Sequence, residues 1–165
     1  MTRPRTFNLA DLFEIVAGCV PDRLAFRCGA QQLSYRELDR RATKLASALR
    51  ARGILRGDNV GIQLHNSAAY LEAFFACCKI GAAPVNVNYR YVADELAYLF
   101  GTLELRALVY GAEFETEVAR ALPRVPTLRT LLSVGNVVSP AGAEAYEAVV
   151  ASGSDGLADP GRSDD

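Results

Sequence analysis

The spacing of apolar residues along the chain predicts where helices and strands alternate. Four apolar residues at helical spacing share one face of a first predicted helix: Leu12, Ile15, Val16 and Cys19. Asn8 can cap the start of this helix and Pro21 ends it. Two short runs follow, Leu24–Cys28 and Gln31–Ser34, and the Gly29 turn between them predicts a hairpin.

A long amphipathic helix follows the hairpin. Ser34 and Glu37 have the S-x-x-E spacing of a capping box, which predicts the helix start, and Gly53 closes the helix. Its apolar face is formed by five residues at helical spacing: Leu38, Ala42, Leu45, Ala46 and Leu49. Such a face predicts burial against another layer of the fold.

The stretch from Ala68 to Tyr91 combines a helix, a stop at Gly81 and a short strand over 82–87 that we expect to be buried. The apolar face predicted for this helix contains Leu71, Phe74, Phe75 and Cys78. A polar cluster leaves the far end of the strand: Asn86, Asn88, Tyr89 and Arg90. In open α/β sheets, ligands bind at such carboxyl ends.

From residue 59 onward, strands and helices alternate. Besides the Ala68–Tyr91 unit, the predicted elements are strand 59–64, helix 93–100, strand 106–110, helix 113–122 and strand 130–134. This order predicts an α/β fold with a mainly parallel sheet and flanking helices, preceded by a helix and a small hairpin. We expect residues 1–138 to form this unit, and 139–165 to hold a short helix over 144–151 and an acidic polar tail.

Composition narrows the function classes. The 165 residues are 50% hydrophobic and 22% charged, as in an ordinary globular domain. The formal net charge of −1 provides no basic field, so we expect no nucleic-acid partner. The segment 139–165 holds six acidic residues against Arg162 alone.

We expect no metal site and no membrane span. The chain has one histidine and no C-x-x-C pair, so we expect the four cysteines to be buried free thiols. The basic start is followed by Asp11 and Glu14, which interrupt the apolar run that a signal peptide needs. The chain lacks the ~18 consecutive apolar residues of a transmembrane helix, and we expect a cytoplasmic location.

Known catalytic and phosphate-binding motifs are missing. There is no G-x-x-x-x-G-K-[ST] loop, no G-x-G-x-x-G turn and no G-x-S-x-G elbow, so no catalytic residue is assigned. We interpret His65 as a polar residue at a strand end. The acidic pairs Asp94/Glu95 and Glu113/Glu117 are interpreted as solvated helix surfaces.

Four sequence motifs, in this order along the chain, resemble the N-terminal part of acyl-CoA synthetases of the adenylate-forming (AMP-binding) superfamily. They are the S-Y-R-E-L helix start at 34–38, the strand entry at 49–60, the N-S helix start at 66–76, and the G-A to N-x-R segment at 81–90. Weaker similarity extends through Leu132 and Glu147. The segment 85–100 is most similar to ligases of fatty or steroid-like acids.

The resemblance implies a two-step reaction. A carboxylic acid and ATP form an acyl-adenylate and pyrophosphate with Mg²⁺, and coenzyme A then displaces AMP to give the thioester. The family uses a Thr/Ser/Gly-rich phosphate loop followed by lysine, a ribose-binding aspartate and a C-terminal lysine, none of which this sequence contains. The chain resembles roughly the first third of such an enzyme. We expect the isolated chain to be inactive and to bind no cofactor tightly.

One position of the family pattern implies a ligand contact. The arginine of N-x-R contacts coenzyme A phosphates in some members, and the matching residue is Arg90. A planar guanidinium suits a phosphate, whereas a structural ion pair with Asp94 or Glu95 is the alternative. Asn88 is expected to shape the turn.

Two further functions are considered. A non-catalytic interaction module could pair with a complementary chain, and a receiver-like domain is disfavoured because the strand ends carry no acidic cluster. We also expect an unpaired strand edge after the predicted strand 130–134 to promote self-association.

Overall fold

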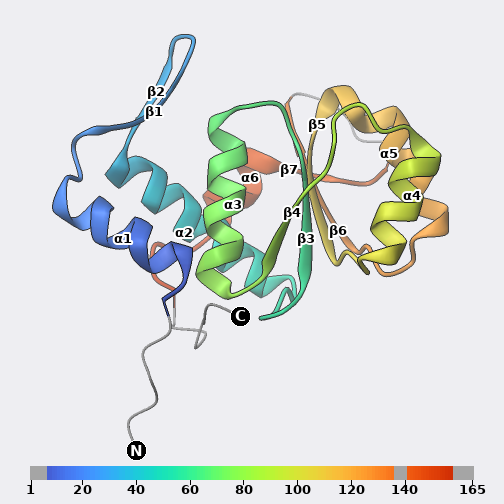
Figure 1. Cartoon of the computed structure of the whole chain (residues 1–165), viewed down its shortest axis with the longest axis horizontal. Coiled ribbons are helices and arrows are strands. Elements are labelled where there is room, and N and C mark those ends of the chain that lie inside the picture. Colours follow the sequence, from blue (N-terminus) through green and yellow to red (C-terminus); the bar gives the residue numbers. More distant parts are fainter. Residues whose placement is uncertain (1–6, 136–140, 158–165) are drawn as a thin grey trace, which may run out of the picture.

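The computed structural model describes residues 7–135 and 141–157 as a five-stranded parallel sheet between two helical layers (Figure 1). A helix and a separate hairpin stand beside one of these layers, and the hairpin projects away from the sheet (Figure 1). The predicted α/β class and the preceding helix and hairpin are confirmed.

The N-terminal region consists of α1 (Leu9–Cys19), the antiparallel pair β1 (Leu24–Cys28) and β2 (Gln31–Ser34), and α2 (Tyr35–Ala51). Both predicted caps are present. The Asn8 side chain accepts a hydrogen bond from the Ala10 amide. At the start of α2, the Ser34 hydroxyl accepts one from the Glu37 amide, and the Glu37 carboxylate accepts one from the Ser34 amide. These bonds satisfy amides at both helix starts. The predicted hairpin bounds and the buried face of α2 are confirmed.

The sheet has the order β4-β3-β5-β6-β7 and all its pairings are parallel. Its strands are β3 (Asn59–Gln63), β4 (Ala83–Asn86), β5 (Ala107–Gly111), β6 (Thr130–Val134) and β7 (Glu144–Ala145). The helices that connect or follow them are α3 (Ala68–Ile80), α4 (Ala93–Thr102), α5 (Glu115–Ala121) and α6 (Tyr146–Ser152). Short 3₁₀ turns flank α5: η1 (Ala112–Phe114) and η2 (Leu122–Arg124).

Side-chain alternation divides the interior into two cores. Val60, Ile62 and Val109 belong to the core shared with α2, α3 and α6, whereas Leu108 and Tyr110 belong to the core shared with α4 and α5. Strand β5 is buried along its whole length because both faces are covered.

The strand expected to be buried after Gly81 is instead an edge strand. Among the described strands, β4 pairs only with β3, and Ala83 and Asn86 at its two ends are exposed. Pro84 fits there because an edge position leaves one side of the backbone without a ladder partner. The Gly81 stop is confirmed by its left-handed φ of 71° at the helix end.

The predicted apolar face of α1 is wrong. Leu12, Ile15 and Val16 are 52%, 56% and 41% exposed, and the buried side contains Phe13 instead. The Phe13 ring stacks on Phe75 of α3 with 3.9 Å between ring centroids. Apolar residues occupy both sides of α1, and the apolar periodicity used for the prediction follows the side that packs against no other helix among the described residues.

Helix α3 is also turned differently from the prediction. Leu71, Phe74 and Phe75 are only partly buried, because small residues around Ala73 and Ala76 face the sheet. Packing against the neighbouring helices buries two charged residues of α3, Glu72 and Lys79, at 1% and 3% exposure. The Lys79 ammonium pairs with Glu14 of α1 and lies 2.8 Å from Asp39 of α2.

The predicted helix over 144–151 begins later, at Tyr146, because Glu144 and Ala145 form the short strand β7. Strand β7 pairs with Leu132 and Ser133 of β6. The neighbour that we expected strand β6 to lack is therefore present for these two residues. Self-association through the remaining edge stays a prediction.

The cysteines divide into two classes. Cys77 and Cys78 are buried as expected, whereas Cys19 and Cys28 are exposed, which corrects the expectation for those two. Burial raises the pKa of the Cys77 thiol. No helix in the described part of the chain combines the length and apolarity needed to span a membrane.

Candidate functional site

The sheet has a topological switch point between β3 and β5. The chain leaves β3 through α3 on one face and leaves β5 through η1 and α5 on the other (Figure 1). The loops after these neighbouring strands therefore diverge at their carboxyl ends. Crevices of this kind are where open α/β sheets bind ligands.

His65, Glu113, Tyr89 and Phe114 meet at this switch point. His65 follows β3, and its Nε2 lies 3.8 Å from a Glu113 carboxylate oxygen in η1. The rings of Tyr89 and Phe114 lie 4.9 and 5.4 Å from the imidazole, centroid to centroid. The sequence interpretation of His65 as a strand-end residue is confirmed in position, but it missed this convergence.

Arg90 lies beside the same cluster. Its guanidinium carbon is 5.4 Å from the centroid of the Tyr89 ring, and its side chain belongs to an exposed turn. The Arg90 amide donates a 2.9 Å hydrogen bond to Asn88 Oδ1. Asn88 therefore shapes the turn, as predicted, and holds the backbone from which Arg90 projects.

The alternative ion pair of Arg90 with Asp94 or Glu95 is not formed. Asp94 pairs with Arg124 at 2.8 Å, and Glu95 accepts a hydrogen bond from the Val92 amide. Within residues 7–135 and 141–157, no carboxylate forms an ion pair with Arg90. The guanidinium remains available to an anion from outside.

The acidic residues interpreted as solvated helix surfaces make defined contacts with other residues. Glu117 accepts a 2.8 Å bond from the Ala93 amide at the start of α4 and pairs with Arg120. Together with Glu95, it satisfies amides at that helix start. Sequence spacing within one helix could not show a contact between α4 and α5.

A polar row lies directly below the carboxyl edge of the sheet. Gln63, Tyr110 and Ser133 are register partners across β3, β5 and β6, and all three are buried. The Tyr110 hydroxyl donates to Glu115. The Gln63 amide and the Ser133 hydroxyl find no hydrogen-bond partner among the described residues.

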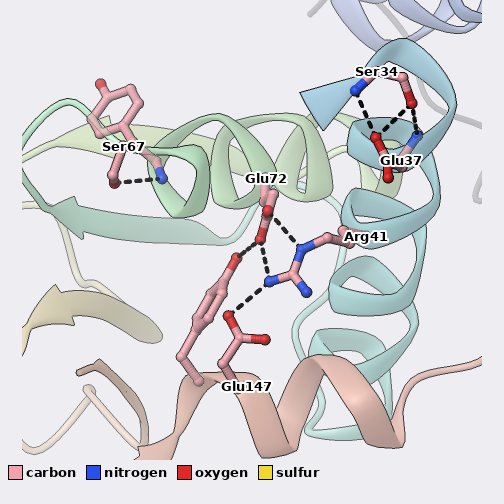
Figure 2. A network of polar contacts seen from close by, with 8 residues as sticks. Ser34, Glu37, Arg41, Ser67, Glu72 and Glu147 are labelled. Atoms are coloured by element: carbon pink, nitrogen blue, oxygen red, sulfur yellow. Dashed lines mark hydrogen bonds and ion pairs between the residues drawn. The ribbon is translucent and has the colours of Figure 1, made fainter. Parts of the chain in front are cut away.

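A second polar group, away from the edge, joins three helices (Figure 2). The Arg41 guanidinium of α2 donates to both oxygens of Glu72 in α3 at 2.7 and 3.1 Å, and to Glu147 of α6 at 2.8 Å. The Tyr146 hydroxyl donates to Glu72 at 2.7 Å. We call these four residues the interhelical network.

Two members of the interhelical network, Tyr146 and Arg41, have raised pKa values. Burial raises the pKa of the Tyr146 phenol, and the adjacent Glu72 carboxylate raises it further. The hydrogen bond to Glu72 raises the pKa of Arg41 above its already high value. Both groups stay protonated at neutral pH and act as hydrogen-bond donors that hold the three helices together.

Further ion pairs hold the segment from β7 onward against α2. Arg52 donates to both oxygens of Glu144 at 2.7 and 2.6 Å, which is a bidentate pair. Lys44 lies 3.8 Å from Asp155. The acidic residues of this segment thus form ion pairs with basic residues on α2 and at its C-terminal end.

The described residues contain no group of three His, Cys, Asp or Glu side chains placed to hold a metal ion. What the carboxyl edge does offer is a free cation, Arg90, beside an aromatic ring and a half-exposed His65–Glu113 pair. This combination suits an anionic ligand with a planar group.

The comparisons with known proteins agree with this fold. The model of the AMP-binding enzyme family matches residues 13–155. The chain is 41% identical over 127 residues to a medium/long-chain-fatty-acid and 3-oxocholest-4-en-26-oate CoA ligase of Mycobacterium marinum, covering 77% of this chain and 23% of the relative. It is 39% identical over the same length to a 3-oxocholest-4-en-26-oate CoA ligase of Rhodococcus rhodochrous, with the same coverage.

The crystal structure of the anthranilate CoA ligase AuaEII in complex with anthranoyl-AMP matches 94% of this chain with a TM-score of 0.89 at 21% identity. This match, which covers 30% of that structure, shows the fold. The chain thus spans about a quarter of the curated relatives' length. Because the family model covers most of the sequence, the chain belongs to the AMP-binding enzyme family.

Proposed function

We propose that this chain is the N-terminal part of an ATP-dependent acyl-CoA ligase. In the complete reaction a carboxylic acid, ATP and coenzyme A give an acyl-CoA, AMP and pyrophosphate. The observation that carries the proposal is the 41% identity to a fatty-acid and steroid-acid CoA ligase over 77% of the chain.

The proposed substrate is a fatty or steroid-like carboxylic acid. Both curated relatives described above have a 3-oxocholestenoate in their names, and one also has medium- and long-chain fatty acids. The identity of the acid is an inference from those names.

Within this function, Arg90 is proposed to contact a phosphate of coenzyme A. The residues present fit such a group: the guanidinium is exposed at the switch point, is not paired with Asp94 or Glu95, and lies beside the Tyr89 ring. A guanidinium can hold two phosphate oxygens in parallel hydrogen bonds. Arg90 would orient the thiol donor and would take no part in forming the adenylate.

The nucleotide half of the reaction is assigned elsewhere in the family's polypeptide. ATP and Mg²⁺ supply the leaving pyrophosphate and the charge stabilisation of adenylation when bound to a whole ligase. The sequence has no lysine after Lys79 and no Gly-rich phosphate loop. We therefore propose that these 165 residues alone form no adenylate, since losing even one well-placed donor costs ~10²–10³ in rate.

A fusion protein tests the assignment of Arg90. This chain would replace the matched 127 residues of the Mycobacterium marinum ligase. In that fusion, we expect Arg90→Ala to raise the KM for coenzyme A by roughly tenfold, the effect of losing one charged hydrogen bond. ATP–pyrophosphate exchange with a fatty acid should stay unchanged, because it precedes coenzyme A binding.

The matched control is Arg40→Ala, an exposed arginine on α2. It should change neither half-reaction. Equal KM values for coenzyme A in the Arg90→Ala fusion and the unchanged fusion would remove Arg90 from the site. A fusion that folds but forms no acyl-adenylate from any fatty or steroid acid would contradict the proposed function itself.

A further inference from the structure

A pocket opens at the amino edge of the sheet, where β3, β5 and β6 begin. Its volume is about 370 Å³, within the range of roughly 300–1,000 Å³ that is usual for small-molecule sites. Its polar lining comes from the first residues of these strands and from the turns before them: Arg52, Asp58, Arg106, Thr127, Arg129 and Thr130. We call this cavity the amino-edge pocket.

Arg129 is an unpaired cation in the amino-edge pocket. It is exposed, and within residues 7–135 and 141–157 its side chain forms no hydrogen bond or ion pair. Arg106 is only weakly engaged, because its Nε lies 3.9 Å from one Asp58 oxygen and 42% of its side chain is exposed. The other Asp58 oxygen accepts a 2.8 Å bond from the Leu55 amide. Two guanidinium groups of the pocket therefore keep their hydrogen-bond donors available.

The fold accounts for the third arginine of the pocket but not for Arg129. Arg52 is the C-cap residue of α2, where a cation suits the negative helix end, and it donates to both oxygens of Glu144. Arg129 lies in the turn between η2 and β6 and belongs to no helix. Glu144 neutralises Arg52, which leaves Arg106 and Arg129 in the pocket against the single Asp58 carboxylate. The pocket therefore keeps a net positive charge.

Thr127 is a second, independent indication of a ligand. Its hydroxyl oxygen is buried and finds no hydrogen-bond partner among the described residues. A buried hydroxyl without a partner lowers stability, and native proteins rarely leave one uncompleted. Because Thr127 lines the pocket, an oxygen atom of a bound anion would accept this hydrogen bond.

The number and kind of these donors select the class of anion. One guanidinium binds two oxygens of the same group in parallel hydrogen bonds. Two guanidinium groups together match an anion with several oxygens and more than one negative charge, as in phosphate and pyrophosphate. A single carboxylate has two oxygens and one charge, so it would occupy one arginine and leave the other unpaired.

We propose that the amino-edge pocket binds a small phosphate-bearing anion between Arg106 and Arg129. Arg90 lies beyond the opposite end of the sheet, and the five residues of β3 keep the two edges roughly 15 Å apart, at about 3.3 Å per residue. One phosphate group cannot bridge that distance, so the two places bind anions independently. The inference needs no step of the ligase reaction.

Isothermal titration calorimetry of the 165-residue chain with sodium pyrophosphate at low ionic strength tests the proposal. We expect saturable binding that Arg129→Ala weakens roughly tenfold, the effect of losing one charged hydrogen bond. Arg106→Ala should act in the same direction. Arg129→Lys should weaken binding less than Arg129→Ala does, because it keeps the charge and loses only the planar fork. Circular dichroism establishes that each variant folds, and Arg106→Gln replaces Arg106→Ala if that variant unfolds.

Two arginines outside the pocket provide matched controls. Arg40 is exposed on α2, and Arg90 lies in the exposed turn after β4. Arg40→Ala and Arg90→Ala remove the same charge elsewhere, so each should leave the Arg129-dependent affinity within twofold. A control variant that weakens pyrophosphate binding as much as Arg129→Ala does would assign the binding to overall charge and overturn the proposal.

Titrations with ATP and with citrate identify the chemistry that is recognised. Tighter binding of ATP than of pyrophosphate, with the same dependence on Arg129, would support the site and name a nucleotide as the source of the phosphates. Equal or weaker binding of ATP would support it and name a compact phosphate. Tighter binding of citrate would overturn the phosphate assignment. The whole proposal fails if millimolar pyrophosphate gives no saturable binding, or if Arg106→Ala and Arg129→Ala bind it as tightly as the unchanged chain.

Discussion

The interhelical network and the carboxyl edge of the sheet use charged residues in opposite ways. In the network, the Glu72 carboxylate is 1% exposed and accepts three hydrogen bonds from Arg41 and Tyr146 (Figure 2). At the edge, His65 and Glu113 lie 3.8 Å apart with both side chains more than half exposed. The first arrangement leaves nothing for a ligand, whereas the second leaves its groups accessible.

This difference separates scaffold from site. A buried ion pair is costly to break because the remaining charge stays in the interior, whereas an exposed pair is screened by water. The network joins α2, α3 and α6, which hold one face of the sheet in place. The edge can change its contacts without disturbing that layer.

Removing the central carboxylate should have the largest effect. Glu72→Ala leaves Arg41 and the Tyr146 hydroxyl without their common acceptor, and we expect a loss of about 3–5 kcal/mol in the free energy of unfolding. Urea unfolding followed by circular dichroism measures it. A loss below about 1 kcal/mol would show that water reaches the network and that the contrast with the edge is false.

Glu147→Ala is the internal control for this experiment. Glu147 contacts the same guanidinium, but its side chain is 73% exposed. We expect a loss of no more than about 1 kcal/mol from this variant. Burial, and not the number of ion pairs, would then account for the difference between the two carboxylates.

The sequence predicted most of the fold because local signals agreed with one another. Capping residues at Asn8 and Ser34, the stop at Gly81 and the alternation after Asn59 each depend on neighbouring residues alone. Predictions failed where apolar residues occupy more than one side of a helix, as in α1 and α3. There, the buried side is chosen by which neighbour is small enough to approach, which no local pattern contains.

The Arg52–Glu144 pair is intermediate in exposure between the interhelical network and the carboxyl edge, and its contribution to stability depends on pH. The hydrogen bonds from Arg52 lower the pKa of Glu144, so this carboxylate stabilises the fold while ionised and loses that contribution as pH falls through its lowered pKa. Glu144→Gln should therefore cost about 1 kcal/mol at pH 7, a value reduced by the 51% exposure of the carboxylate.

The cost of Glu144→Gln should shrink toward zero as the pH falls from 7 through the lowered pKa of Glu144, because the native carboxylate becomes protonated there. Urea unfolding at several pH values follows the difference between the two proteins. Asp22→Asn, at a carboxylate that is 84% exposed and paired with Arg36, is the comparison variant. A cost for Glu144→Gln that stays constant over this range would assign the effect to packing of β7.

The candidate site was only partly visible in the sequence. Arg90 and Asn88 were found because a short motif links them, and Asn88 does shape the turn. His65 and Glu113 are 48 positions apart and meet only because β3 and β5 are neighbours in the sheet. This contact can be inferred only when the strand order β4-β3-β5 is known, and the alternation of strands and helices along the sequence does not determine that order.

The smallest effect on stability is expected at the carboxyl edge itself. Arg90→Ala and His65→Ala remove exposed side chains, so each should change the free energy of unfolding by no more than about 0.5 kcal/mol. The same Arg90→Ala change is expected to weaken coenzyme A binding in the fusion protein. An effect on binding without an effect on stability would place Arg90 in the site and outside the scaffold. If Arg90→Ala instead destabilises the chain as much as Glu72→Ala does, Arg90 stabilises the turn after β4, and its role is structural.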